Sequence, residues 1–210
     1  PINEEQSRWL ATGKIVITMG RYVSSKGHIH LIRAFSRVVK RYPDSKLLLL
    51  GDGELRGIYE KTIEILHLEN NVILCGFQNN PFALLGRSDV FVFPSKWEGF
   101  GYALEEAICC GIPCISTDFK YGARDILRYN GEEILKDAVY TKYGVLIPVC
   151  NGEVGDSIAC NSEEEIMAEA IIKVLEDKEY QKKIIENNSN RLYEFSLECM
   201  VARWSEALGR

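Results

Sequence analysis

One pattern recurs along most of the chain: a short apolar run, a turn rich in Gly, Pro, Asp or Asn, and a longer stretch with helical periodicity. This alternation is typical of βαβ units. The apolar runs are continuous, as expected for parallel strands covered by helices on both faces. They are Lys14–Met19, Leu47–Leu50, Val72–Cys75, Val90–Phe93, Pro113–Ser116 and Val145–Val149. The sequence therefore predicts an α/β fold with a six-stranded parallel sheet flanked by helices.

The segments between these runs are predicted to be helices. The segment His30–Val39 is amphipathic, with apolar positions three and four apart, and it ends before Pro43. Further helices are expected near Leu55–Leu66, Pro81–Gly86, Leu104–Cys110, Ala123–Arg128, Glu164–Leu175 and Lys178–Asn187. Asn151–Asn161 is expected to contain a mobile loop. The three histidines lie at predicted helix ends, and we expect all of them at the surface: His28, His30 and His67.

Composition excludes several classes of protein. The 210 residues, 46% of them hydrophobic, can bury one sizeable core. A net charge of −5, with acidic and basic residues interspersed, does not favour a nucleic-acid-binding surface. The seven cysteines form no Cys-x-x-Cys framework, which suits a reducing compartment. Cys110 and Cys114 are interpreted as small apolar residues rather than zinc ligands, so no metal site is expected.

No sequence signal directs the chain out of the cytoplasm. No window approaches the ~20 apolar residues of a membrane span, and the first five residues are too polar for a signal peptide. We expect a cytoplasmic protein. A location at the inner face of the membrane, through peripheral association of the full-length protein, is left open.

The loop after the first apolar run carries two cations. Gly20 and Arg21 open this loop, and Lys26 and Gly27 close it directly before an amphipathic helix. Two cations beside the positive end of a helix macrodipole suit a diphosphate. The alternative is an ordinary solvated turn in which Gly27 only permits entry into the helix.

Two further loops follow the second and third apolar runs. The segment Gly51-Asp52-Gly53 lacks the Gly-x-Gly-x-x-Gly spacing, and its acidic side chain would repel phosphates. We interpret it as a tight turn before a helix rather than as a nicotinamide-cofactor site. After the third run, Phe77 either frames a base as an exposed aromatic or packs into the core.

The segment after the fourth apolar run has the strongest functional signal. Seven residues separate Glu98 from Glu106, so the first can lie in the loop and the second on the helix, both facing one cleft. Carboxylates accept hydrogen bonds from sugar hydroxyls. Gly99 and Gly101, which flank Phe100, permit close approach of backbone amides to an anion at the helix start. A solvated pair of glutamates is the alternative.

These residues also resemble a known motif. Glu98-Gly99-Phe100-Gly101, Glu106-Ala107 and Gly111-Ile112-Pro113 are similar to the Glu-x7-Glu motif of family 4 glycosyltransferases, with the Gly-x-Pro that usually follows it. Other blocks of that family occur in the same order: Gly20-Arg21 with Lys26-Gly27, Gly51-Asp52-Gly53, Asn71-Val72 with Gly76-Phe77, and Asp89–Ser95. The resemblance spans Gly20–Asp118. Tyr102-Ala103 departs from it, because many relatives carry an aliphatic residue and Pro there.

The resemblance implies the C-terminal half of a GT-B enzyme, in which two Rossmann-like domains face each other across a cleft. We then expect a linker at residues 1–10, one Rossmann-like domain at 11–195, and a terminal helix at 196–210 that packs toward an N-terminal domain absent from this chain. The C-terminal domain of such enzymes binds the nucleotide-sugar donor without a metal or other cofactor. Because the N-terminal domain supplies acceptor binding, this chain alone is expected to bind donor but transfer sugar poorly.

The resemblance also implies roles for individual residues. The two cations would neutralise the leaving diphosphate, Glu98 would contact hydroxyls of the transferred sugar, and Glu106 would hold the ribose hydroxyls. The implied catalytic residues are Arg21, Lys26 and Glu98, and the implied donor-binding residues are Gly20, Phe77, Gly99, Phe100, Gly101 and Glu106.

Thr117–Leu127 resembles a Gly-Pro-Arg-Glu-Ile-Leu loop of bacterial capsule and lipopolysaccharide transferases, with Ala123 and Asp125 as substitutions. Retaining transfer from a UDP-linked sugar to a glycan or lipid-linked acceptor, in bacterial surface polysaccharide synthesis, is the function expected. GDP- and ADP-linked sugars remain alternatives for the donor. A non-catalytic nucleotide-binding module and a related GT-B nucleotide-sugar epimerase remain alternatives for the function.

Overall fold

The computed structural model describes residues 13–152 and 159–209 of the chain. The predicted linker at 1–10 and the centre of the predicted loop at 151–161 lie outside them. The strands are β1 (Ile15–Met19), β2 (Lys46–Leu50), β3 (Val72–Leu74), β4 (Val90–Phe93), β5 (Cys114–Thr117), β6 (Val139–Tyr140) and β7 (Val145–Ile147). The α-helices are α2 (His28–Arg41), α3 (Arg56–Ile65), α4 (Phe82–Leu85), α5 (Tyr102–Cys109), α6 (Ala123–Ile126), α7 (Ser162–Glu176), α8 (Lys178–Ser189) and α9 (Leu197–Ala207). Two short 3₁₀ turns are η1 (Ser24–Lys26) and η2 (Leu192–Phe195).

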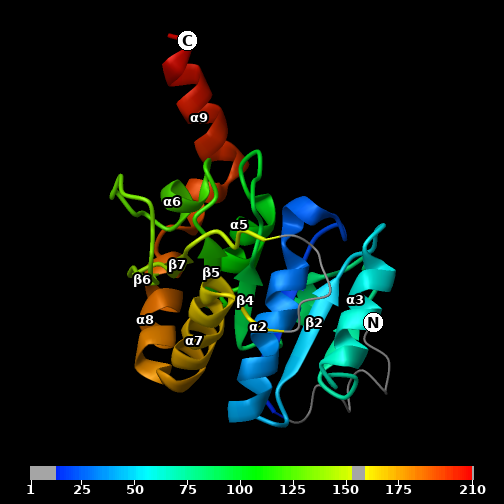
Figure 1. Cartoon of the computed structure of the whole chain (residues 1–210). Helices are drawn as coiled ribbons and strands as arrows, with labels where there is room; N and C mark the ends of the chain where they lie inside the picture. Colours follow the sequence, from blue (N-terminus) through cyan, green and yellow to red (C-terminus); the bar gives the residue numbers. More distant parts are fainter. Residues whose placement is uncertain (1–12, 153–158, 210) are drawn as a thin grey trace.

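All seven strands form one sheet, in the order β3-β2-β1-β4-β5-β7-β6 (Figure 1). The α/β class and the parallel strands are confirmed. The prediction of six strands is wrong by one, because β6 pairs antiparallel with β7 through Val139 and Tyr140. Two residues are too short a run to show a strand period in the sequence, and only the partner strand makes them recognisable.

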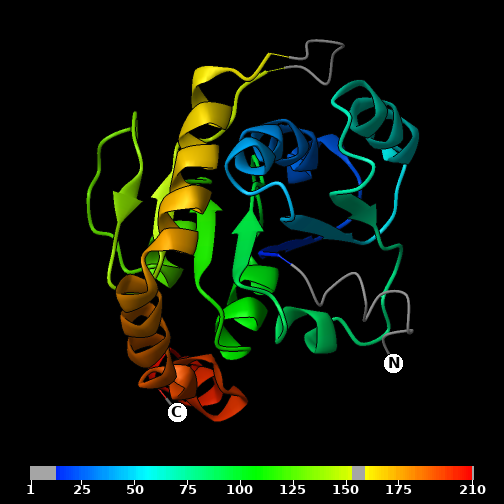
Figure 2. The same ribbon diagram turned by 90° about the horizontal axis from the view of Figure 1, so that it is seen from below.

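Helices cover both faces of this sheet (Figure 2). Side chains of α2, α3 and α7 pack with one set of strand residues, such as Val16 and Leu47. Those of α4, α5 and α6 pack with the other set, such as Ile17 and Leu48. Because successive strand residues point to opposite faces, each continuous apolar run contributes to both cores. The chain therefore has two hydrophobic layers around one sheet, and its polar loops are left at the strand ends.

The prediction that His28 and His30 lie at the surface is wrong, since both side chains are buried. His28 begins α2 and packs against the rings of Tyr22 and Tyr59. Nδ1 of His30 lies 2.6 Å from Oε1 of Glu164, which is also buried. The first turn of α2 is covered on all sides by neighbouring elements, and the helical period of the sequence does not show this. His67, just after α3, is exposed as expected.

The position of the Glu164 side chain is fixed by hydrogen bonds at the N-terminus of α7. The side chain of Asn161 accepts a hydrogen bond from the Glu164 backbone N–H, and the Glu164 carboxylate accepts one from the Asn161 backbone N–H. This capping box satisfies two backbone donors at the start of the helix. It also fixes the carboxylate against α2, so that the buried His30 has a partner.

Stability should depend on pH through His28. Burial, with a smaller contribution from nearby Lys26, lowers the pKa of His28 to about 3 from an ordinary 6.5. Between these values the unfolded chain binds a proton that the folded chain does not. The contribution of His28 to the free energy of unfolding is therefore fully present above pH 6.5. It falls by roughly 1.4 kcal/mol per pH unit as the pH drops toward 3. Urea unfolding at pH 7 and pH 5 measures this effect. Between these two pH values, we expect the free energy of unfolding to fall by about 2 kcal/mol more in the natural chain than in His28→Leu. An equal fall in the free energy of unfolding in the two proteins would contradict the lowered pKa of His28.

The last helix extends away from the rest of the domain (Figure 1). Its exposed apolar side chains include Leu197, Met200, Val201 and Trp204, and that of Leu208, just after the helix, is exposed as well. Ser196 caps it by accepting a hydrogen bond from the Cys199 backbone N–H. The terminal helix is thus present where expected, and its packing toward a second domain stays a prediction. In the described part of the chain no helix is long and apolar enough to cross a membrane.

Candidate donor-binding site

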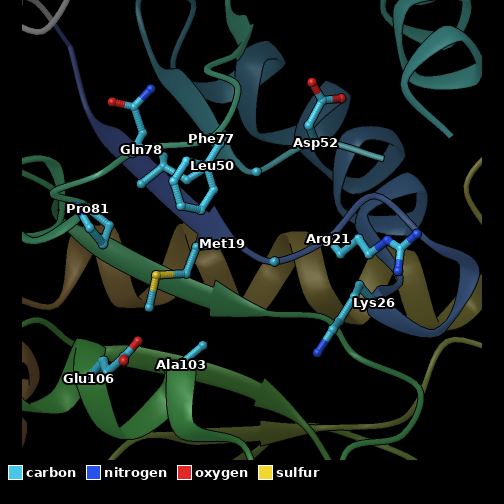
Figure 3. A pocket seen from close by; sticks show the side chains of 12 residues that line it. Met19, Arg21, Lys26, Leu50, Asp52, Phe77, Gln78, Pro81, Ala103 and Glu106 are labelled. Carbon is cyan, nitrogen blue, oxygen red and sulfur yellow. The ribbon is translucent and has the colours of Figure 1, made fainter. Parts of the chain in front are cut away.

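A cavity of about 590 Å³ opens at the carboxyl ends of β1, β2 and β3, beside α5 (Figure 3). The connections leave β1 and β4 in opposite directions along the sheet, which makes their boundary the switch point where ligands bind in open α/β sheets. The volume lies in the range of ordinary small-molecule sites. The cavity is lined by Met19, Gly20, Arg21, Lys26, Leu50, Gly51, Asp52, Phe77, Gln78, Pro81, Ala103 and Glu106.

The cavity brings together several of the predicted site residues: Gly20, Arg21, Lys26, Phe77 and Glu106. Arg21 and Lys26 lie near each other, and Glu106 on α5 lies away from them (Figure 3). Phe77 is 80% exposed, which excludes the alternative that it packs into the core. Within the described residues, no partner is found for Arg21, which is exposed. The cavity thus has cations in one part and a carboxylate in another.

Glu98 does not line this cavity, but it is joined to it through Lys26. Nζ of Lys26 lies 2.5 Å from Oε1 of Glu98, and the same oxygen accepts a hydrogen bond of 2.7 Å from the hydroxyl of Ser95. The Lys26 and Glu98 side chains are 26% and 12% exposed, so water only partly screens their attraction.

Two backbone contacts hold the Lys26 and Glu98 loops together. The Lys96 N–H donates to the Ser25 carbonyl at 2.7 Å. Gly27, with φ of +64°, lies so close to the Pro94 carbonyl oxygen that a Cβ atom would come within 2.0 Å of it. Only glycine fits both the left-handed backbone and this close approach. The sequence showed each loop separately, and the contact between them comes from the pairing of β1 with β4.

The glycine-rich segment between the two glutamates lies at the start of α5, outside the cavity lining. Gly101 is the N-cap residue of α5, with φ of +102°, and Gly99 is exposed. Phe100 is 39% exposed, and its ring centroid is 5.6 Å from that of Tyr102. The structure therefore places Gly99, Phe100 and Gly101 next to Glu98 rather than among the cavity walls.

Other cavity residues were not predicted as site residues. Asp52 lies in the turn before α3, as interpreted from sequence, and also lines the cavity. Met19 and Leu50 are the last residues of β1 and β2. Their position at strand ends is the signal that could have identified them. Gln78, Pro81 and Ala103 carry no comparable signal, and only their packing beside the cavity identifies them.

Among the described residues, no group of three or more His, Cys, Asp or Glu side chains is arranged to hold a metal ion. Cys114 is buried and its thiol pKa is raised by desolvation, as expected of an apolar core residue.

Several relatives of known sequence are named as glycosyltransferases. The chain is 36% identical to an uncharacterized glycosyltransferase of Methanocaldococcus jannaschii, over 97% of this chain and 52% of that protein. It is 32% identical, over 80% of this chain and 39% of the relative, to the N-acetylgalactosamine-N,N'-diacetylbacillosaminyl-diphospho-undecaprenol 4-alpha-N-acetylgalactosaminyltransferase of Campylobacter jejuni. The chain thus spans about half, or less, of the length of these relatives.

Solved structures show the same fold. A point mutant of S. aureus TarM in complex with Fondaparinux, alpha-GlcNAc-glycerol and UDP superposes with a TM-score of 0.74 and 26% identity, over 92% of this chain and 35% of that chain. Anabaena HepE in complex with UDP superposes with a TM-score of 0.75 and 23% identity, over 98% of this chain and 51% of HepE. The family model described as glycosyl transferases group 1 matches residues 1–139. This chain belongs to that family and has the fold of a C-terminal GT-B glycosyltransferase domain.

Proposed function

We propose that the cavity binds a nucleotide-diphosphate sugar, most simply a UDP-linked sugar, for retaining glycosyl transfer of the family 4 type. The observation that carries the proposal is the grouping of Arg21 and Lys26 in a cavity that also holds an exposed aromatic, Phe77, and a carboxylate, Glu106. Cations recognise phosphates, an aromatic face stacks on a base, and a carboxylate accepts from ribose hydroxyls.

The residues divide the work of the proposed reaction. Arg21 and Lys26 neutralise charge that develops on the diphosphate as the glycosidic bond breaks, so no metal is required. Glu106 holds the ribose, and Glu98 contacts hydroxyls of the transferred sugar. Backbone amides of Gly99–Gly101 support the sugar or a phosphate. In a same-face route the acceptor oxygen bonds to the anomeric carbon from the side on which the bond to the diphosphate breaks, which retains the configuration. The departing phosphate takes the proton of the acceptor hydroxyl.

The names of relatives support the acceptor class. The Campylobacter relative is named as acting on a diphospho-undecaprenol compound. A Bacillus subtilis relative, 29% identical over 92% of this chain, is named poly(glycerol-phosphate) alpha-glucosyltransferase. We propose that the acceptor is a glycan or a lipid-linked glycan used in surface polysaccharide synthesis at the cytoplasmic side of the membrane. Acceptor binding would require a second domain, so this chain alone is expected to bind donor with little or no transfer.

Titration calorimetry with UDP, GDP, ADP and CDP tests the proposed donor. We expect UDP to bind and the others to bind more weakly. UDP should also bind better than 2′-deoxy-UDP, and Glu106→Ala should reduce that preference by about 10-fold, because a hydrogen bond to a charged group contributes about 1.5–3 kcal/mol.

The neighbouring residue on the same helix gives a matched control. Glu105 lies outside the cavity lining, and desolvation raises its pKa. Glu105→Ala should leave the preference for UDP over 2′-deoxy-UDP unchanged. Binding of no nucleotide by the natural chain, or an undiminished ribose preference in Glu106→Ala, would count against the proposal.

A further inference from the structure

Ser95 is buried at the point where the Lys26 and Glu98 loops meet. Its side chain has no exposed surface, and its hydroxyl donates to Oε1 of Glu98 at 2.7 Å. A buried hydroxyl that donates to a carboxylate makes a charge-assisted hydrogen bond, which is stronger than a neutral one.

The backbone of Ser95 is itself fixed by the neighbouring strand. The hydroxyl of Thr117, at the end of β5, donates to the Ser95 carbonyl at 2.5 Å and lies 3.2 Å from the Phe93 carbonyl. Thr117 is fully buried. The neighbouring strand therefore fixes the backbone position from which the Ser95 hydroxyl reaches Glu98.

The same carboxylate oxygen has a second donor, Lys26, at 2.5 Å. Lys26 also lines the cavity, where the proposed function has it contact a diphosphate. A diphosphate competes with Glu98 for that ammonium group, because it carries more negative charge than one carboxylate. When Lys26 turns to the diphosphate, Ser95 remains as the donor that holds Glu98.

We infer that Ser95 is a positioning residue: it holds one oxygen of Glu98 so that the carboxylate keeps its place for the donor sugar while Lys26 binds the diphosphate. In the described residues the second oxygen, Oε2, has no hydrogen-bond partner and is left to accept from sugar hydroxyls. This inference rests on the proposed function. It adds a residue that does not touch the donor and acts only through Glu98.

The test compares affinities for UDP and for UDP-glucose, UDP-galactose and UDP-N-acetylglucosamine by calorimetry, in the natural chain, Ser95→Ala, Glu98→Ala and the double variant. The sugar used is the one whose affinity relative to UDP changes in Glu98→Ala. We expect Ser95→Ala to weaken binding of that UDP-sugar by about 5-fold while UDP affinity changes by less than about 2-fold. In the Glu98→Ala background, Ser95→Ala should cause no further loss specific to the sugar.

Equal losses for UDP and the UDP-sugar in Ser95→Ala, or a sugar-specific loss that adds to that of Glu98→Ala, would overturn the inference and leave the proposed donor site standing. No nucleotide binding by the natural chain, or no sugar-specific change in Glu98→Ala, would instead overturn the proposed function and the inference with it.

Two further variants distinguish a positioning role of Ser95 from a general loss of stability. Ser88→Ala also removes a buried hydroxyl, which donates to the Leu84 carbonyl at 2.9 Å away from the cavity, and should change neither affinity. Thr117→Val keeps the shape of Thr117 but removes the bond to the Ser95 carbonyl. It should lower UDP-sugar affinity selectively, by less than Ser95→Ala does, and an equal effect on UDP would contradict the positioning role.

Discussion

Arg21→Ala is expected to lower the affinity of the chain for UDP by about 10- to 100-fold. Arg21 lines the cavity and is exposed, and it has no partner in the described ranges, so its truncation should not disturb the fold. Its guanidinium can make two parallel bonds to phosphate oxygens. Calorimetric titration with UDP, at two salt concentrations, measures the loss. The salt dependence should also decrease, because the removed contact is electrostatic.

Arg41→Ala is the matched control for Arg21→Ala. Arg41 is an exposed arginine at the far end of α2, and its pairing with Glu176 lies at the surface. Exposed pairs of this kind contribute little to stability. The control should bind UDP like the natural chain. A folded Arg21→Ala variant with unchanged UDP affinity would show that Arg21 does not contact the diphosphate.

Gly27→Ala is expected to destabilise the chain by roughly 3 kcal/mol or more. The new Cβ would lie 2.0 Å from the Pro94 carbonyl oxygen, and φ of +64° is unfavourable for any residue with a side chain. The overlap with the Pro94 carbonyl oxygen can be relieved only if the loop that carries Lys26 moves away from the loop that carries Glu98. Thermal unfolding should show a decrease in Tm of roughly 10 °C, and UDP affinity should also fall because Lys26 is displaced.

Gly57→Ala is the control for Gly27→Ala, because it adds a methyl group where there is space for one. Gly57 lies in α3, and a Cβ there meets no atom within 4 Å. Alanine favours a helix over glycine by up to about 1 kcal/mol, so this variant should be as stable as the natural chain or more so. If Gly27→Ala proved as stable as Gly57→Ala, the close contact between the two loops would be wrong.

Much of the architecture could be predicted because strand burial and helical period are local properties. Val16 and Ile17 lie in one continuous apolar run, and this continuity indicated a sheet covered on both faces before any contact was known. β6 was missed because two residues have no period, and the burial of His28 was missed because it depends on Tyr22 and Tyr59.

The cavity could be predicted in part for the same reason. Gly20, Arg21 and Phe77 come one or two residues after apolar runs, so the rule that ligands bind at strand carboxyl ends predicted the edge of the sheet where the cavity opens. Ala103 and Gln78 have side chains with no distinctive chemistry, and they line the cavity only because α5 and the loop after β3 pack beside it.

The sequence by itself determined which residue types follow each strand: cations after β1, an aromatic after β3 and two glutamates around the start of α5. The tertiary structure alone decided which of them meet. It joined Lys26 to Glu98 through the pairing of β1 with β4, and it placed the Ser95 hydroxyl on that same carboxylate. The physical reason is that a hydrogen bond or ion pair depends on distances of a few ångströms between segments far apart in the chain, and these distances are set by strand order and packing.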